Sequence, residues 1–211
     1  MRPRRPPYIK NQYYHFYNRG ANGSRIFRED DNYVYVLTKC KENCNRLSIS
    51  MIAYCLMPNH YHFLVRQDGD LNAGLLPQRI FNAYTKAFNK RYQRSGTLFE
   101  GPYEVIMVEQ DNHLIHLCRY IHANPVKGNI VENLEDWLYS NYLEWMGLRD
   151  GTLVDKGFIN QQFDSVELYR EFLLNYLHNP SAEVDMDGAY QEYFYRPCLD
   201  ATHEPTCIAS R

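Results

Sequence analysis

The chain has 211 residues, of which 45% are hydrophobic and 23% charged, so it can bury a core of its own and is not disordered or low in complexity as a whole. No apolar run approaches the ~20 residues of a membrane helix, and no signal-peptide core follows the basic N-terminus, so we expect a soluble, cytoplasmic protein with no membrane partner. The net charge is −2, but residues 1–128 carry 18 Lys and Arg against 10 Asp and Glu, whereas residues 129–211 carry 5 against 15. This division favours nucleic acid as the partner of the first part, and ordinary variation in surface charge is the alternative.

Strand and helix patterns alternate along the first two thirds of the chain. In chain order we expect a strand at 13–17, a helix at about 30–46, strands at 48–56 and 60–66, a helix at 71–92, a strand at 104–109, and helices from 111 to about 124 and from 165 to 177. Asp30 or Asp31 and then Asp111 are suitable N-caps, and Pro125 is expected to end the helix that Asp111 begins. The short break Met57-Pro58-Asn59 makes the two strands beside it neighbours in a hairpin.

The order of these elements predicts an α+β fold. A β-α-β-β-α-β succession is ferredoxin-like, with an antiparallel sheet and helices packed on one face, and a C-terminal helical and irregular extension follows it here. We divide the chain into a mobile basic arm, a main domain, a helical extension and an acidic, irregular tail, at residues 1–12, 13–128, 129–178 and 179–211.

The predicted helix at 71–92 carries two different stripes. At about 100° per residue, Arg79, Lys86, Lys90 and Arg94 fall on one stripe, and Phe81, Tyr84 and Phe88 fall on another. The aromatic stripe can pack while the basic one contacts a DNA backbone. A solvated basic face is an equally good interpretation of the helix alone.

Two stretches contain residues suited to chemistry. His60 and His62 lie at i and i+2 of a strand, so both imidazoles point to one face, and Tyr61 points to the other. Paired imidazoles suit a divalent metal, although a satisfied or exposed histidine pair is more common.

The second stretch is the helix that begins at Asp111. Its residues His113, His116, Tyr120 and Asn124 share one side, which is either the wall of a site or a solvent-facing stripe. If this helix crosses the open face of the sheet, a metal on His60 and His62 could meet Tyr120. A tyrosine hydroxyl, with an ordinary pKa near 10, could then attack a polarised phosphodiester.

Four stretches together resemble one family. The stretch Met57-Pro58-Asn59-His60-Tyr61-His62-Phe63-Leu64-Val65 resembles the HUH motif of single-tyrosine transposases of the insertion-sequence kind. Three others resemble the branch of REP-associated tyrosine transposases: Tyr14-His15-Phe16-Tyr17-Asn18-Arg19-Gly20, the pair Tyr84–Asn89 and Gly96–Gly101, and Tyr120-Ile121-His122-Ala123-Asn124-Pro125-Val126-Lys127. The resemblance covers about residues 13–145.

The resemblance implies a function for residues 13–128 as an HUH endonuclease domain that nicks and joins single-stranded DNA near hairpins. His60 and His62 match the metal ligands, Tyr120 the nucleophile, and Asn124 the polar residue that completes the metal site, with Mg²⁺ or Mn²⁺ expected. Cleavage would leave a 5′-phosphotyrosine and a 3′-hydroxyl. The protein would be a monomer or a homodimer.

We expect basic and polar residues of three segments to contact single-stranded DNA and DNA hairpins. These segments are the N-terminal arm, the motif that begins at Tyr14, and the basic stripe of the helix at 71–92. The residues are Arg2, Arg4, Arg5, Asn18, Arg19, Arg79, Lys86, Lys90 and Arg94, while Tyr13 or Tyr17 could stack on bases. Two features differ from the family: Tyr61 is bulkier than usual, and Glu100-Gly101-Pro102-Tyr103 replaces a more basic stretch. Tyr84 is a competing nucleophile that we place in the core. The rival functions are a non-catalytic DNA-hairpin binder and a metal-dependent RNA phosphodiesterase.

Overall fold

A computed structural model describes residues 5–109 and 111–178 of the chain. Its sheet has the strand order β2-β3-β1-β4, and each neighbouring pair is antiparallel. The strands are β1 (Tyr13–Arg19), β2 (Ile49–Met57), β3 (His60–Gln67) and β4 (Glu104–Val108). The α-helices are α1 (Asp30–Leu47), α2 (Leu75–Arg91), α3 (Asp111–Lys127), α4 (Tyr142–Trp145), α5 (Lys156–Gln162) and α6 (Val166–His178). The expected ferredoxin-like α+β fold is confirmed, with β3 in the interior of the sheet.

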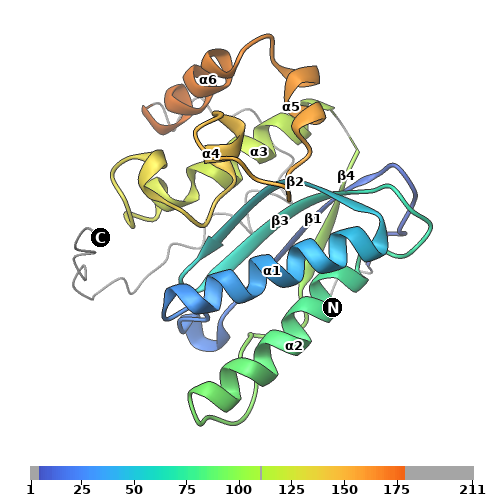
Figure 1. Ribbon diagram of the computed structural model, residues 1–211, viewed down its shortest axis with the longest axis vertical. Helices are drawn as coiled ribbons and strands as arrows, with labels where there is room; N and C mark the ends of the chain where they lie inside the picture. Colours follow the sequence, from blue (N-terminus) through green and yellow to red (C-terminus); the bar gives the residue numbers. More distant parts are fainter. Residues whose placement is uncertain (1–4, 110, 179–211) are drawn as a thin grey trace.

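The two faces of the sheet are covered by different parts of the chain. Figure 1 shows α1 and α2 on one side of the sheet and α3 to α6 on the other. The helices inside the β-α-β-β-α-β unit therefore pack on one face, as expected. The opposite face receives α3 and the extension that follows it.

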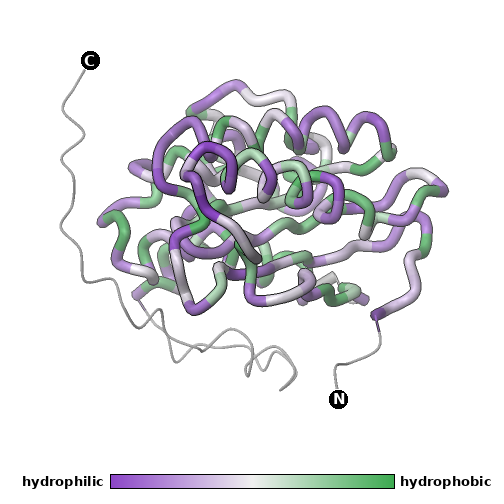
Figure 2. The backbone as a smooth tube through the Cα atoms, turned by 90° about the horizontal axis from the view of Figure 1, so that it is seen from below, coloured by the Kyte–Doolittle hydropathy of each residue, from purple (hydrophilic) through white to green (hydrophobic). Residues whose placement is uncertain are grey.

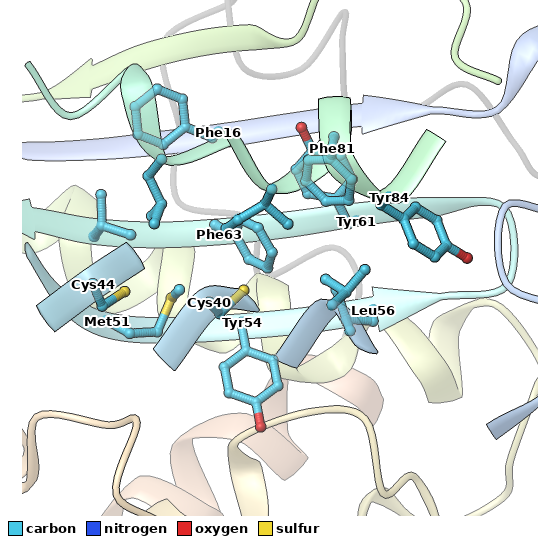
Figure 3. Packing of buried hydrophobic residues seen from close by; sticks show 14 of the residues in the cluster. Phe16, Cys40, Cys44, Met51, Tyr54, Leu56, Tyr61, Phe63, Phe81 and Tyr84 are labelled. Atoms are coloured by element: carbon cyan, nitrogen blue, oxygen red, sulfur yellow. The ribbon is translucent and has the colours of Figure 1, made fainter. Parts of the chain in front are cut away.

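Alternating side chains of the strands separate two cores. On β1 and β3, Tyr14, Phe16, Tyr61 and Phe63 are buried in the core beneath α1 and α2. In Figure 3 Tyr61, Phe63 and Phe81 lie close together in this core. The Tyr61 and Phe81 rings are stacked with centroids 3.9 Å apart. The bulky Tyr61 is therefore accommodated on the face of the sheet opposite to His60 and His62.

The extension completes the outer edge of β2. The backbone N–H of Leu56 donates to the carbonyl of Tyr139 at 2.9 Å, and Asp155 N–H donates to the carbonyl of Met51 at 3.1 Å. Residues 129–178, which were expected to form an extension separate from the domain 13–128, thus share a core with α3 and β2. The short helix α4 packs here through Trp145, whose ring N–H donates to the Ile52 carbonyl at 3.1 Å.

Several boundaries differ from the sequence-based expectations. α3 continues past Pro125 to Lys127 instead of ending near Asn124, because a proline in the last turn removes one backbone donor without preventing the turn. α2 begins at Leu75 and not near 71, since Asn72 caps a turn there by accepting from Gly74 N–H at 2.7 Å. Arg94 lies beyond the end of α2 and is not part of its stripe.

The described part of the N-terminal arm lies against the body of the protein. The Tyr8 ring packs on Tyr14 with centroids 5.1 Å apart, and the Arg5 guanidinium lies over the Tyr103 ring at 4.5 Å. Residues 1–4 and the acidic tail 179–211 lie outside the described residues.

The hydropathy of the chain follows this layered arrangement. Figure 2 shows hydrophobic stretches along the strands in the middle of the molecule and hydrophilic stretches in many outer turns. Among the described helices, none combines the length and the apolar character that crossing a membrane requires.

Candidate active site

Strand β3 presents His60 and His62 on the face of the sheet that α3 covers. In the register of β1 and β3, His62 is opposite Tyr17 and His60 is opposite Arg19. Directly opposed residues of an antiparallel pair share a face, so these four side chains project toward α3. The two imidazole rings are 5.1 Å apart between centroids and nearly perpendicular.

His60 is oriented by two asparagines. Its Nδ1 lies 2.7 Å from Oδ1 of Asn59, and its Nε2 lies 3.3 Å from Oδ1 of Asn124. The amide of Asn124 is oriented independently, since its Nδ2 donates to the carbonyl of Tyr120 at 2.9 Å and a carbonyl can only accept. If Nδ1 of His60 donates to Asn59, then Nε2 and the Asn124 oxygen both direct lone pairs into the same space.

His62 joins this site to a helix and to a third histidine. Its ring lies edge-on to the Tyr120 ring, with centroids 5.5 Å apart and planes at 88°. Its Nδ1 lies 3.0 Å from Nε2 of His15 on β1. The side chain of His62 is buried, and that of Tyr120 is half-buried.

Burial keeps these imidazoles neutral. It lowers the pKa of His60 to about 4 and that of His15 to about 3, and it lowers the pKa of His62 well below 6.5. The charge of Arg19 further lowers the pKa of His60, and the Asn124 amide oxygen, which would accept a hydrogen bond from the protonated ring, acts in the opposite direction. Neutral imidazole is the form that binds metal ions, so these rings are in the form that metal binding requires at neutral pH.

The sequence of α3 explains why Tyr120 faces the histidines. Leu114, Leu117, Cys118 and Ile121 are buried between this helix, β2 and the extension. Tyr120 and Asn124, which are one turn apart, lie at the border of this buried side, where Tyr120 contacts His62 and Asn124 faces His60. The expected combination of His60, His62, Tyr120 and Asn124 is found in one place.

The donor set of this site fits a divalent cation. Within the described ranges, no three His, Cys, Asp or Glu side chains come close enough together to hold a metal ion. The histidine pair therefore needs a ligand of another type, and the amide oxygen of Asn124 faces His60. Two imidazole nitrogens and an amide oxygen suit a first-row ion such as Mn²⁺, and Mg²⁺ prefers oxygen ligands.

A bidentate ion pair lies at the end of β1 beside His60. The guanidinium of Arg19 donates through Nε and Nη2 to the two carboxylate oxygens of Glu100, with Nη2 at 2.8 Å from Oε1. Both side chains are about half exposed. Glu100 belongs to a segment that extends the sheet, because its N–H donates to the carbonyl of Arg19 at 3.0 Å. The fork of Arg19 that could bind a DNA phosphate is thus bonded to a carboxylate.

Several residues expected in the site or at the DNA lie elsewhere. His116 packs against Phe172 of α6 with ring centroids 5.3 Å apart, so it belongs to the contact between α3 and α6 instead of the site wall. Burial lowers the pKa of His116, and Arg119 and His113 lower it further. The side-chain amide of Asn18 donates to the carbonyl of Gly101 at 2.9 Å and holds the segment that carries Glu100.

The basic residues of α2 and of the described part of the arm are not at the histidine pair. Arg79, Lys86 and Lys90 are exposed on the helix that covers the other face of the sheet, and half-buried Arg94 donates to the carbonyl of Thr97 at 3.3 Å. Arg5 contacts Tyr103, as described above, and Arg2 and Arg4 lie outside the described residues.

The competing tyrosine and the missed histidine have clear positions. Tyr84 is buried under α1 and donates to the carbonyl of Ile26, as the core interpretation predicted. The contact of His15 with His62 was not expected. The alternation of β1 could have indicated that His15 shares the face of Tyr17, but not which residue of β3 lies beside it.

Comparisons with known proteins identify a family and a fold for this chain. The model of the family described as "Transposase IS200 like" matches residues 8–124, which is more than half of the chain. A Haemophilus influenzae protein named a REP-associated tyrosine transposase is 27% identical over 113 residues, or 48% of this chain and 64% of that protein. The matched chain therefore spans just under two thirds of that relative's length. The structure of a REP-associated tyrosine transposase bound to a REP hairpin gives a TM-score of 0.57 at 15% identity, covering 74% of this chain and 98% of the other. At this identity, the structural likeness shows a shared fold.

Proposed function

The chain belongs to the family of IS200-like transposases, and we propose that it cleaves and rejoins single-stranded DNA near hairpins through a covalent bond to Tyr120. The observation that carries the proposal is the contact between the side chains of α3 and those of β3. Tyr120 lies edge-on to His62, and Asn124, one turn later, faces His60.

We propose that His60, His62 and Asn124 hold one divalent ion, Mn²⁺ or Mg²⁺. When bound, such an ion would supply Lewis acidity toward a phosphodiester oxygen. The residues themselves support this role by their neutral imidazoles and by the amide oxygen directed at His60. Because β3 is an interior strand, both histidines are carried by a rigid element.

Tyr120 is the nucleophile in this proposal. Its phenolic oxygen forms a bond to phosphorus while the bond from phosphorus to the 3′ oxygen breaks. The tyrosyl proton is lost, and the 3′ oxygen gains a proton, so the products are a 5′-phosphotyrosine and a 3′-hydroxyl. The phosphodiester bond energy is kept in the tyrosyl ester, so rejoining by a 3′-hydroxyl needs no nucleotide cofactor.

DNA hairpins are the proposed partner. The relative of known structure is bound to a REP hairpin, and the first 128 residues of this chain are basic. Phosphate contacts would come from the basic residues of this part.

A labelled hairpin with a single-stranded flank tests the proposal. Incubation with the protein and Mn²⁺ should give a slowly migrating covalent band in a denaturing gel. The variant in which His60 and His62 are both replaced by Ala should fold and give no such band. Binding without a covalent band would favour the non-catalytic hairpin binder, and hydrolysis without a covalent band would favour a phosphodiesterase.

A further inference from the structure

A third histidine lies directly behind the proposed metal pair. His15 is in the middle of β1, is fully buried, and has its Nε2 at 3.0 Å from Nδ1 of His62. The two ring planes differ by 18°, and the centroids are 5.2 Å apart. This spacing and angle correspond to a hydrogen bond that lies nearly in the plane of both rings.

One proton between these two nitrogens can be placed in two ways. If Nδ1 of His62 carries it and donates to His15, then Nε2 of neutral His62 is unprotonated. If Nε2 of His15 carries it, then Nε2 of neutral His62 must carry a proton and cannot bind a metal ion. Metal ligation through Nε2 therefore requires His15 to be the acceptor.

We propose that His15 is a positioning residue that accepts a hydrogen bond from Nδ1–H of His62 and thereby fixes the tautomer and the ring orientation of that ligand. This inference rests on the proposed function, because the orientation of His62 matters when that side chain binds a cation. Metal-bound histidines usually donate their second N–H to a carboxylate, a carbonyl or water. In this chain a neutral imidazole takes that place.

The surroundings of His15 suit an acceptor. The ring is fully buried, which disfavours a charged imidazolium, and a neutral imidazole keeps a lone pair that can accept a hydrogen bond. The ring of Tyr17, on the same face of β1, packs over His15 with centroids 5.0 Å apart and planes at 26°. β1 pairs with β3 on one side and with β4 on the other, which limits movement of its backbone.

The energetic cost of burying an imidazole argues for a specific role. An apolar ring of similar size would fill the same space in the sheet without desolvating two polar nitrogens. The bond to His62 offsets part of this cost, and losing the acceptor would leave a buried N–H of His62 without its bond to His15.

A direct test measures the tautomer of His62 in the metal-free protein. Long-range ¹H–¹⁵N correlation spectra at pH 7 distinguish a protonated from an unprotonated ring nitrogen. We expect the proton of His62 on Nδ1 and an unprotonated Nε2. A proton found on Nε2 of His62 would overturn the inference, whether or not the protein binds metal.

A pair of variants tests the consequence for metal affinity. His15→Phe keeps an aromatic ring and removes the acceptor, and His15→Gln places an amide oxygen near the position of Nε2. Titration calorimetry with Mn²⁺ should show affinity reduced by about 10–100-fold in H15F, with most of the loss recovered in H15Q. Equal affinity of H15F and the wild type would contradict the proposal, as would equal losses in both variants.

The two proposals fail in distinguishable ways. If the wild-type protein does not bind Mn²⁺, the metal site of the proposed function is refuted, and the tautomer measurement still decides the role of His15. Binding of hairpin DNA in the absence of metal by H15F reports whether that variant is folded. If H15F does not fold, the metal-free spectrum of the wild type gives the answer.

Discussion

Replacing Asn141 by Ala should strongly destabilise the protein. This fully buried residue joins the extension to both β2 and α3. Its Oδ1 accepts from the Tyr54 N–H at 2.6 Å and lies 2.9 Å from Nε2 of His122, while its Nδ2 donates to the carbonyl of Ile52 at 2.8 Å. The Ile52 carbonyl also accepts from Trp145, so it keeps one partner in the variant.

The expected loss follows from the two donors that would remain without Asn141. An unsatisfied buried N–H costs about 1–3 kcal/mol, so the N–H groups of Tyr54 and His122 together would cost about 2–6 kcal/mol. This is a large part of the ~5–15 kcal/mol that stabilises a typical domain. In a chain of this size, each kcal/mol lowers Tm by about 2–4 °C, so a loss of about 4 kcal/mol corresponds to about 8–16 °C.

Urea unfolding and thermal unfolding of both proteins measure this loss. Asn133→Ala is a matched control, because the side chain of Asn133 is exposed and bonds only locally to Asp136 among the contacts described here. The control should change the free energy of unfolding by less than about 0.5 kcal/mol. A loss below about 1 kcal/mol in N141A would refute the argument that this residue satisfies the edge of β2.

Three further predictions concern charge. Glu100→Gln should raise affinity for single-stranded DNA by up to about fivefold, because it removes the carboxylate that holds Arg19 in an ion pair worth up to about 1 kcal/mol. The control Glu42→Gln, which breaks an ion pair on α1, should leave this affinity unchanged. Unchanged or weaker binding by E100Q would count against this reasoning. Replacing Arg79, Lys86 and Lys90 by Gln should reduce the slope of log affinity against log salt concentration for hairpin binding by about 0.7–0.9 per lost phosphate contact. Because α2 lies on the face of the sheet away from His62, the replacement should not change the binding of a strand without a stem. An unchanged slope for the hairpin would mean that these residues form a solvated face. Burial lowers the pKa of His122 to about 4 from an ordinary 6.5, so the free energy of unfolding should fall by about 3 kcal/mol for this residue as pH decreases from about 6.5 to about 4. Urea unfolding of H122Q over the same pH range should show a smaller fall than the wild type. An identical fall in H122Q and the wild type would contradict the assignment.

The sequence predicted the elements whose pattern is local. Alternation and the hairpin break identified β2 and β3 to within one or two residues, and the helical period of α3 placed Tyr120 and Asn124 on one side of that helix. β1 extends to Arg19 because it pairs with His60 of β3, and no local signal contains that information. The same reason hid the contact between His15 and His62, which depends on the register of two strands about 47 residues apart.

Tertiary packing also decided the parts that the sequence did not predict. The short helices α4 and α5 lack a periodic pattern of useful length, and they form where the extension covers β2. His116 lies on the same side of α3 as Tyr120, but α6 covers it, and the position of α6 could not be inferred from the pattern of α3. A helical stripe therefore identified which residues share a side of the helix but not which of them reach the site.

The identity of the nucleophile is the most direct test of the proposed function. The covalent adduct with hairpin DNA, trapped in Mn²⁺ and digested, should attach the DNA to the peptide that contains Tyr120. Tyr120→Phe removes one oxygen and little packing, so it should keep hairpin binding and abolish the adduct, because Phe has no oxygen to attack phosphorus. Tyr84→Phe changes a buried hydroxyl of the opposite core and should keep the adduct. An adduct formed by Y120F, or DNA attached to the peptide that contains Tyr84, would contradict the proposed mechanism.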